Sequence, residues 1–143
     1  MAKEKITYQP KVKHYILALA STLKDYRLSY FINDILAIEL AKKDDLIYEN
    51  KKESKAKKHS LFSYFDEEND LQYFLLQNKL PDNVIIKSLK NFDFLFIIKT
   101  IDEENPFDIG EVYNKLNNID DVQLIFKDPA LKPAEQKIIA KEF

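Results

Sequence analysis

The strongest apolar run of this sequence is DFLFIIK, which covers residues 93–99. A short run so rich in Phe, Leu and Ile is typical of a strand that lies inside a sheet. We therefore predict that residues 93–99 form a central strand, beside which the other strands of the domain pair. Further β-favouring runs predict strands at residues 14–20, 45–49, 60–65, 71–77, 84–86 and 122–127.

Two other segments have apolar residues at helical spacing, which predicts helices over about residues 22–37 and 106–119. The first helix has the stripe Leu28, Phe31, Ile32, Ile35 and Leu36. Thr22 followed by Asp25 forms a weak capping box at its start. Asn105 and Pro106 place a capping residue before a proline at the start of the second helix.

The order of these segments, β-α-β-β-β-β-α-β, predicts an α+β domain over residues 1–128. Its sheet has about five to six antiparallel strands and packs against the two helices. The short polar linker DEEND between residues 60–65 and 71–77 indicates a hairpin. Residues 129–143 follow as a C-terminal tail or a short helix.

Composition excludes several functions of a chain of 143 residues that has no cysteine and one glycine, Gly110. Without cysteine there is no disulfide, no thiol catalysis and no zinc site with Cys ligands. Phosphate-binding loops and dinucleotide fingerprints need several glycines close together, so both are excluded. No apolar stretch approaches the about 20 residues of a membrane-spanning helix. We therefore expect a cytoplasmic protein without a membrane partner.

Asp25, Tyr26 and Arg27 stand side by side at the predicted start of the first helix. In a structural interpretation, Asp25 caps the helix, Tyr26 packs, and Arg27 is solvated or ion-paired. In a functional interpretation, the three residues contact an anionic group or a protein partner. The pattern favours the first interpretation and leaves the second open.

Acidic clusters and histidines give no strong sign of catalysis or metal binding. Residues 66–70 (DEEND) and 102–104 (DEE) lack the ligand spacing and the glycine of a calcium loop, so we interpret them as solvated turns. His14 and His59 have no acidic partner at ligand spacing, and no serine stands in a Gly-x-Ser-x-Gly motif. We expect no catalytic residue, no metal and no cofactor, and an enzyme with an unrecognised site is the weakest alternative.

A basic segment, NKKESKAKK, precedes the predicted hairpin at residues 50–58. Its lysines are Lys51, Lys52, Lys55, Lys57 and Lys58. Together with the strand aromatics Phe62, Tyr64, Tyr73 and Phe74, this basic segment has the ingredients of single-strand nucleic-acid binding. The net charge of −2 argues against that role, and a surface loop beside core aromatics is the simpler interpretation.

The basic segment and the acidic turn lie at opposite ends of one predicted strand, His59–Phe65, which spans roughly 23 Å. They cannot neutralise each other within one straight strand. A salt-sensitive contact between two copies, or with another protein, is therefore a reasonable hypothesis.

Several segments together resemble the bacterial family named for its motif I-P-E-x-x-x-D-Y. They are KDYRLSYFIN (24–33), KKDDL (42–46), LFSYFDEEN (61–69) and YFLLQNK (73–79). Asp93-Phe94 stands in place of the Asp-Tyr of the motif, and Lys87-Ser88-Leu89 in place of its Ile-Pro-Glu. The family has no assigned activity, so the resemblance implies a small cytoplasmic bacterial protein and no catalytic residue. It raises interest in residues of the shared segments: Asp25, Tyr26, Arg27, Asn33, Asp45, Asn78 and Asp93.

The sequence as a whole favours a non-catalytic domain that binds another protein or a second copy of itself. The alternative is a domain that binds RNA or single-stranded DNA through the lysines of residues 51–58 and the strand aromatics.

Overall fold

The structure is a computed structural model, and it describes residues 12–49, 56–101 and 107–143. Six antiparallel strands form one sheet in the order β2-β3-β4-β7-β1-β8. They are β1 (Lys13–Ser21), β2 (Ala41–Glu49), β3 (Ala56–Asp66), β4 (Leu71–Gln77), β7 (Phe94–Thr100) and β8 (Val122–Lys127). β7 lies between β4 and β1 and is almost entirely buried, which confirms the predicted central strand. The α+β class and the antiparallel sheet are as predicted.

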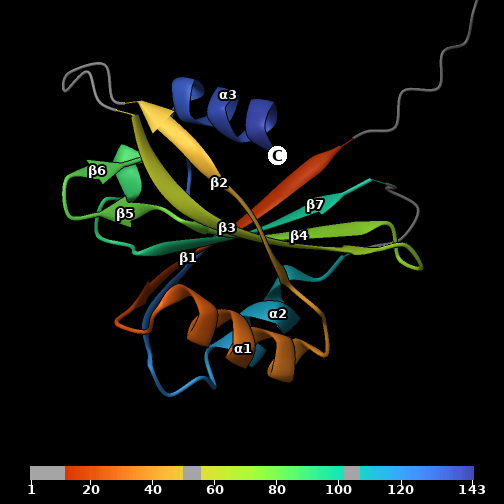
Figure 1. Cartoon of the computed structure of the whole chain (residues 1–143). Coiled ribbons are helices and arrows are strands. Elements are labelled where there is room, and N and C mark those ends of the chain that lie inside the picture. The colour runs from red at the N-terminus through yellow and green to blue at the C-terminus, as the bar shows by residue number, and fades with distance from the viewer. Residues whose placement is uncertain (1–11, 50–55, 102–106) are drawn as a thin grey trace, which may run out of the picture.

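Both faces of this sheet are covered (Figure 1). Helices α1 (Asp25–Leu36) and α2 (Ile109–Leu116) cover one face, where Leu28, Ile32 and Leu116 join the first hydrophobic core. Helix α3 (Pro133–Glu142) covers the other face, where Ile139 and Phe143 join a second core. Of the two forms expected for residues 129–143, a tail or a short helix, the structure has the helix. This helix packs on the sheet and forms a third layer, whereas the prediction placed only two helices against the sheet.

The connection between β4 and β7 also belongs to the second face. It contains a small hairpin of β5 (Lys79–Leu80) and β6 (Asn83–Val84), followed by the 3₁₀ helix η1 (Lys87–Leu89). The predicted strand at residues 84–86 is therefore wrong beyond Val84. Ile85 and Ile86 are instead buried in the second core, which explains their apolar character.

The helix starts differ from the prediction. α1 begins at Asp25, and its N-cap is Lys24, whose side chain makes no capping hydrogen bond. The predicted capping box of Thr22 and Asp25 is therefore wrong: the amide of Leu23 donates instead to Oγ of Ser21, 3.1 Å away. α2 begins at Ile109 rather than at residue 106, because the Asp108 side chain accepts from the amide of Gly110 at 2.9 Å and caps the helix there. Residues 105 and 106 lie outside the described part.

Among the described residues, three that are not glycine adopt the left-handed region. They are Ala37 (φ 54°), Asp70 (φ 52°) and Asp128 (φ 51°). Ala37 follows α1, and its amide donates to the carbonyl of Asn33. A left-handed alanine costs roughly 1–2 kcal/mol because its Cβ crowds the backbone. The single glycine of the chain, Gly110, is in a helix and serves none of these turns.

Candidate functional site

Two of the seven residues that the sequence singled out share a pocket at one end of the sheet. Asp25 and Asp93 lie 68 positions apart in the chain, and both line a cavity of about 540 Å³. Lys24 and Lys79 line the same cavity. Two acidic and two basic residues therefore line this pocket beside the first turn of α1.

Asp93 holds this end of the sheet together. Its Oδ2 accepts a hydrogen bond from the amide of Ser21 at 3.0 Å. Its carbonyl accepts from the amides of Asn78 at 2.9 Å and Lys79 at 3.3 Å. Oγ of Ser21 in turn donates to the carbonyl of Asp121 at 2.7 Å. These bonds connect β1 with the segments before β7 and β8, so the local chemistry of Asp93 is structural.

Asn78 is completely buried and has a structural role of its own. Its Nδ2 donates to the carbonyls of Leu89 at 3.0 Å and Phe92 at 3.2 Å, and its Oδ1 accepts from the amide of Ile86 at 2.8 Å. One side chain thus satisfies three backbone groups of the connection between β4 and β7. It offers nothing to a ligand in solution.

Asn33 and Asp45 also serve local structure. The Asn33 side chain accepts from the amide of Leu40 at 2.7 Å and donates to its carbonyl at 3.2 Å, which fixes the exit from α1. Asp45 is ion-paired with Lys42 on the edge strand β2. Neither residue lines the pocket of Asp25 and Asp93.

Tyr26 and Arg27 lie on the outer surface of α1. The tyrosine is 61% exposed, so the predicted packing of Tyr26 is wrong, while the solvated Arg27 agrees with the prediction. Tyr30, one turn further on, is 67% exposed. The Arg27 guanidinium lies 5.9 Å from the ring centre of Phe31, and the rings of Tyr30 and Phe31 meet edge to face at 5.6 Å.

The proposed basic patch is only partly described. Lys51, Lys52 and Lys55 lie outside the described residues. Lys57 pairs with Asp82 at 2.6 Å, and Lys58 is exposed. The acidic residue Asp66 ends β3, at the opposite end of the strand from Lys57, as expected.

The strand aromatics do not form a stacking surface for bases. Phe62, Tyr73 and Phe74 are buried, and Tyr64 stacks on Tyr73 with ring centres 6.1 Å apart. This corrects the aromatic half of the nucleic-acid hypothesis, because a base cannot reach rings that fill the cores.

His59 is a buried group that the sequence did not reveal as such. It is fully buried, with Nδ1 2.7 Å from the carbonyl of Gln77 and Nε2 3.0 Å from Nδ2 of Asn83. A carbonyl only accepts and an amide NH₂ only donates, so Nδ1 carries the proton and Nε2 accepts. Burial lowers the pKa of His59, against the opposing influence of Gln77, Asp45 and Asp82. No local sequence signal marks this site, because its partners come from β4 and from the β5–β6 hairpin.

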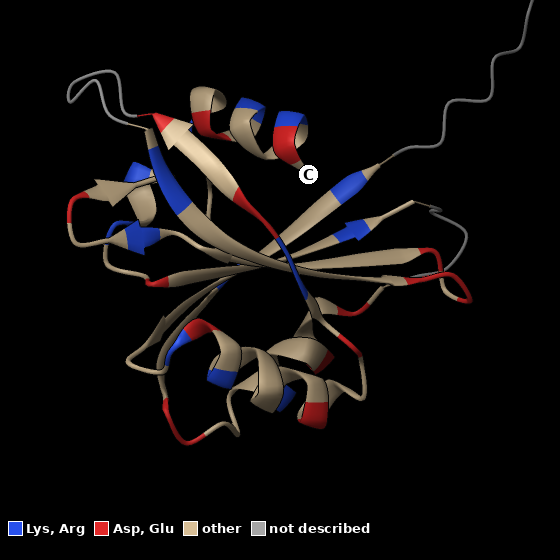
Figure 2. Cartoon of the chain, viewed as in Figure 1, with Lys and Arg blue, Asp and Glu red and all other residues tan. Residues whose placement is uncertain are grey.

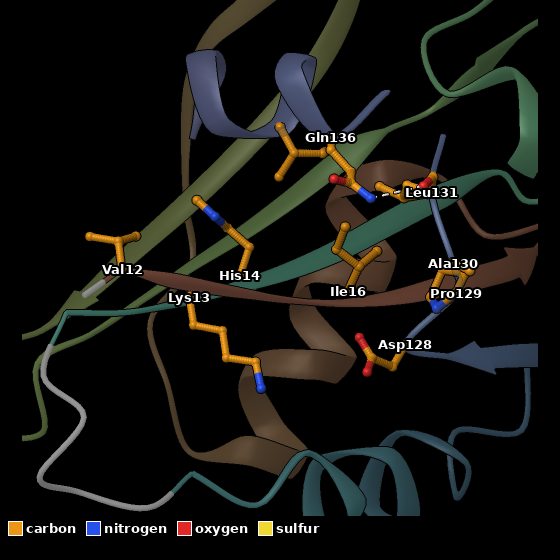
Figure 3. A pocket seen from close by; sticks show the side chains of 10 residues that line it. Val12, Lys13, His14, Ile16, Asp128, Pro129, Ala130, Leu131 and Gln136 are labelled. Carbon is orange, nitrogen blue, oxygen red and sulfur yellow. Dashed lines mark hydrogen bonds between the residues drawn. The ribbon is translucent and has the colours of Figure 1, made fainter. Parts of the chain in front are cut away.

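A second pocket of about 530 Å³ lies between β1 and α3, and His14 and Ile16 point into it from β1 while Lys13 points away (Figure 3). Gln136 of α3 borders it and donates to the carbonyl of Leu131 at 3.0 Å. Burial, with a smaller contribution from Lys99, lowers the pKa of His14 in spite of a backbone hydrogen bond at Phe143. Burial therefore favours the uncharged form of His14.

Within residues 12–49, 56–101 and 107–143, no three His, Asp or Glu side chains stand close enough to share a metal ion. Among the helices of the same ranges, none has the length and apolar character to cross a bilayer.

No protein-family model, no curated protein and no solved structure matches this chain. The resemblance to the I-P-E-x-x-x-D-Y family therefore stays a prediction from the residues.

Proposed function

We propose that this protein is a non-catalytic, cytoplasmic interaction domain that binds another protein through the outer face of α1. The observation that carries this proposal is the exposure of two tyrosines, Tyr26 and Tyr30, one helical turn apart around Arg27. Asp34 continues the same exposed stripe. Tyr26 and Arg27 also lie in KDYRL, residues 24–28, which is the most specific piece of the family resemblance.

Tyrosine and arginine, like tryptophan, are enriched among the residues that dominate binding energy at protein interfaces. A tyrosine offers a large rigid apolar ring with a polar end, and little entropy is lost when it is held in place. An arginine pairs with a carboxylate through two parallel hydrogen bonds. The partner surface that fits this face has an apolar recess for the rings and a carboxylate for Arg27.

The α1 face is separate from the groups that maintain the fold. The side chains of Asn33, Asn78 and Asp93 satisfy backbone groups, whereas Tyr26, Arg27 and Tyr30 point outward. Substitutions on the α1 face should therefore change binding without changing stability.

The test is affinity capture from native cytoplasm, with and without nuclease, read by mass spectrometry. Arg27→Ala and Tyr30→Ala are compared with Lys137→Ala, which removes an exposed positive charge from α3 on the other side of the sheet. We expect a protein that survives nuclease, is retained by the Lys137 variant and is lost with both α1 variants. A retained set that is the same for all variants would contradict the proposal.

The nucleic-acid alternative predicts a different result. Capture would then depend on intact nucleic acid and would fall when the lysines of residues 51–58 are replaced.

A further inference from the structure

The two edge strands of the large sheet differ in how well they resist pairing with another strand. β2, at one edge, carries Lys42, Lys43, Asp44 and Asp45 (Figure 2). Its register with β3 shifts between Lys43 and Leu46. Charges and bulges are the features by which natural edge strands avoid pairing. β2 is therefore a protected edge.

β8, at the other edge, is not protected in the same way. Its sequence is VQLIFK, with one charged residue at its end. Its register shifts once, at Gln123, and is regular from Leu124 to Lys127. Leu124 is 57% exposed and Phe126 is 49% exposed. This is an apolar, β-favouring edge of the kind on which strands add.

Within the described part of the chain, no strand pairs with the outer side of β8. The amide of Asp128 donates to the carbonyl of Ile16 at 2.9 Å, in register with the pairing of β1 and β8. Because bonded and non-bonded pairs alternate in an antiparallel ladder, the backbones of Leu124 and Phe126 face β1. Those of Ile125 and Lys127 therefore face away from the sheet.

We propose that β8 pairs with β8 of a second copy of this chain, antiparallel and with Ile125 opposite Ile125. The outward backbone groups of Ile125 then bond across the twofold axis. Leu124 of each copy faces Phe126 of the other in a non-hydrogen-bonded pair, where side chains come closest. In this register, the contact between Leu124 of one copy and Phe126 of the other therefore occurs twice, once on each side of the twofold axis.

The charges at the ends of β8 favour the same partner. Asp120 and Asp121 precede the strand, and Lys127 ends it. Antiparallel pairing brings the basic end of each copy beside the acidic start of the other. Asp128 adopts φ 51° and turns the chain after its bond to Ile16, so the pairing with a second copy ends at Lys127. A strand running parallel would place like charges together.

This inference is independent of the α1 interface, because β8 and the outer face of α1 share no residue. Each can fail without the other. A dimer through β8 leaves Tyr26, Arg27 and Tyr30 available to a different protein.

A charge exchange on β8 tests the register, with association measured by sedimentation equilibrium from micromolar to about 1 mM. We expect Leu124→Glu and Phe126→Lys each to weaken dimerisation at least tenfold. The double variant Leu124→Glu/Phe126→Lys should recover it, because each glutamate then faces a lysine. Ile47→Glu, which adds a charge to an exposed apolar site of β2, is the matched control and should have no effect. Circular dichroism confirms that each variant is folded.

Amide hydrogen exchange of the unaltered protein supplies a second, independent measurement. The amides of Ile125 and Lys127 should become protected as protein concentration rises, while those of Leu124 and Phe126 are protected throughout. A monomer at every concentration would overturn the proposal. So would single variants that dimerise normally, a double variant that does not recover, or exchange at Ile125 that ignores concentration.

Discussion

Both carboxylate oxygens of Glu135 accept hydrogen bonds from one residue, Ser88. Oγ of Ser88 donates to Oε1 at 2.6 Å, and its amide donates to Oε2 at 2.9 Å. The two residues lie 47 positions apart, in η1 and α3. This contact fastens α3 to the connection between β4 and β7, and it gives Ser88 a structural role.

Removing the hydroxyl of this pair should destabilise the domain. Ser88→Ala leaves one oxygen of the buried Glu135 carboxylate without its shortest hydrogen bond. Hydrogen bonds to charged groups contribute about 1.5–3 kcal/mol, and we expect a loss near the lower end because Lys132 still donates to Oε1. Urea unfolding at neutral pH measures the loss. Ser63→Ala on β3 is a comparison substitution, and an equal loss there would show that the Ser88 contact has no special role.

Acid should weaken the same contact. Burial alone would raise the pKa of Glu135, but hydrogen bonds from Ser88 and Lys132 hold it below the usual 4.5. Since the folded protein binds this proton less readily than the unfolded chain does, the stabilisation is complete above pH 4.5 and is lost as the pH falls through the folded value. The free energy of unfolding is measured at several pH values from about 6 to about 3. It should fall less for Glu135→Gln than for the unaltered protein, because the variant has no carboxylate to protonate at this position. Glu142→Gln, at the exposed end of α3, should show the full loss.

His59 should make stability depend on pH in a higher range. Its lowered folded pKa means that the unfolded chain takes up a proton first, below its own pKa of 6.5. The contribution of His59 to the free energy of unfolding is therefore fully present above pH 6.5. It decreases as the pH falls from 6.5 to the lower pKa of the folded protein. In ¹⁵N spectra at neutral pH, Nδ1 of His59 should carry the proton and Nε2 should carry none. The imidazole ring of His59 should stay uncharged as the pH falls through 6.5, where a fully exposed histidine would titrate. An ordinary titration near 6.5 would contradict the buried contacts with Gln77 and Asn83.

Asn78 and Arg27 should separate structure from binding. Asn78→Ala removes three buried hydrogen bonds, and the amide of Ile86 and the carbonyl of Phe92 lose the partner that Asn78 supplies. The carbonyl of Leu89 still accepts from the amide of Phe92 at 2.9 Å, and we expect a loss of about 2–4 kcal/mol. Arg27→Ala should change stability by no more than about 0.5 kcal/mol, because its side chain is exposed. Thermal unfolding compares the two variants. If Arg27→Ala lowered stability by more than this, its loss of binding could not be assigned to the α1 face.

Replacing Ala37 with glycine should stabilise the domain. Ala37 is exposed and adopts φ 54° after α1, where glycine has no Cβ to crowd the backbone. The expected gain is about 0.5–1 kcal/mol, since the greater entropy of unfolded glycine offsets part of the relief. Ala41→Gly in β2 should destabilise instead. A lower melting temperature for the Ala37 variant would contradict this account.

Salt should distinguish the two modes of self-association. A contact between the basic segment and the acidic turn weakens as salt rises, because exposed charges are screened. A dimer held by the backbone of β8 and by Leu124 and Phe126 should persist at about 1 M salt. Sedimentation at low and high salt decides between them, and dissociation at high salt would favour the contact between the charged ends of β3.

The sequence predicted elements whose signal is local. The stripe of α1 was recognisable because its apolar residues repeat with the period of a helix. The strand β7 was recognisable because a short unbroken apolar run is typical of a strand that is buried on both faces. The cover by α3 was less clear, since Ile139 and Phe143 are the only buried apolar residues of 133–143 and most of the other residues there are exposed. The roles of Asn78, His59 and Glu135 could not be predicted. Each of these side chains bonds to residues that are distant in the sequence and that only the fold brings together. The neighbouring residues in the sequence do not indicate that these side chains are buried.

The protected edge at β2 determines how far assembly can proceed. Pairing through β8 uses the apolar edge of both copies, and the two sheets of six strands become continuous. The outer boundaries of that joined sheet are then the charged, bulged β2 strands of the two copies. Because the pairing is symmetric and each copy has one such edge, the assembly closes at two chains and does not propagate into a fibre.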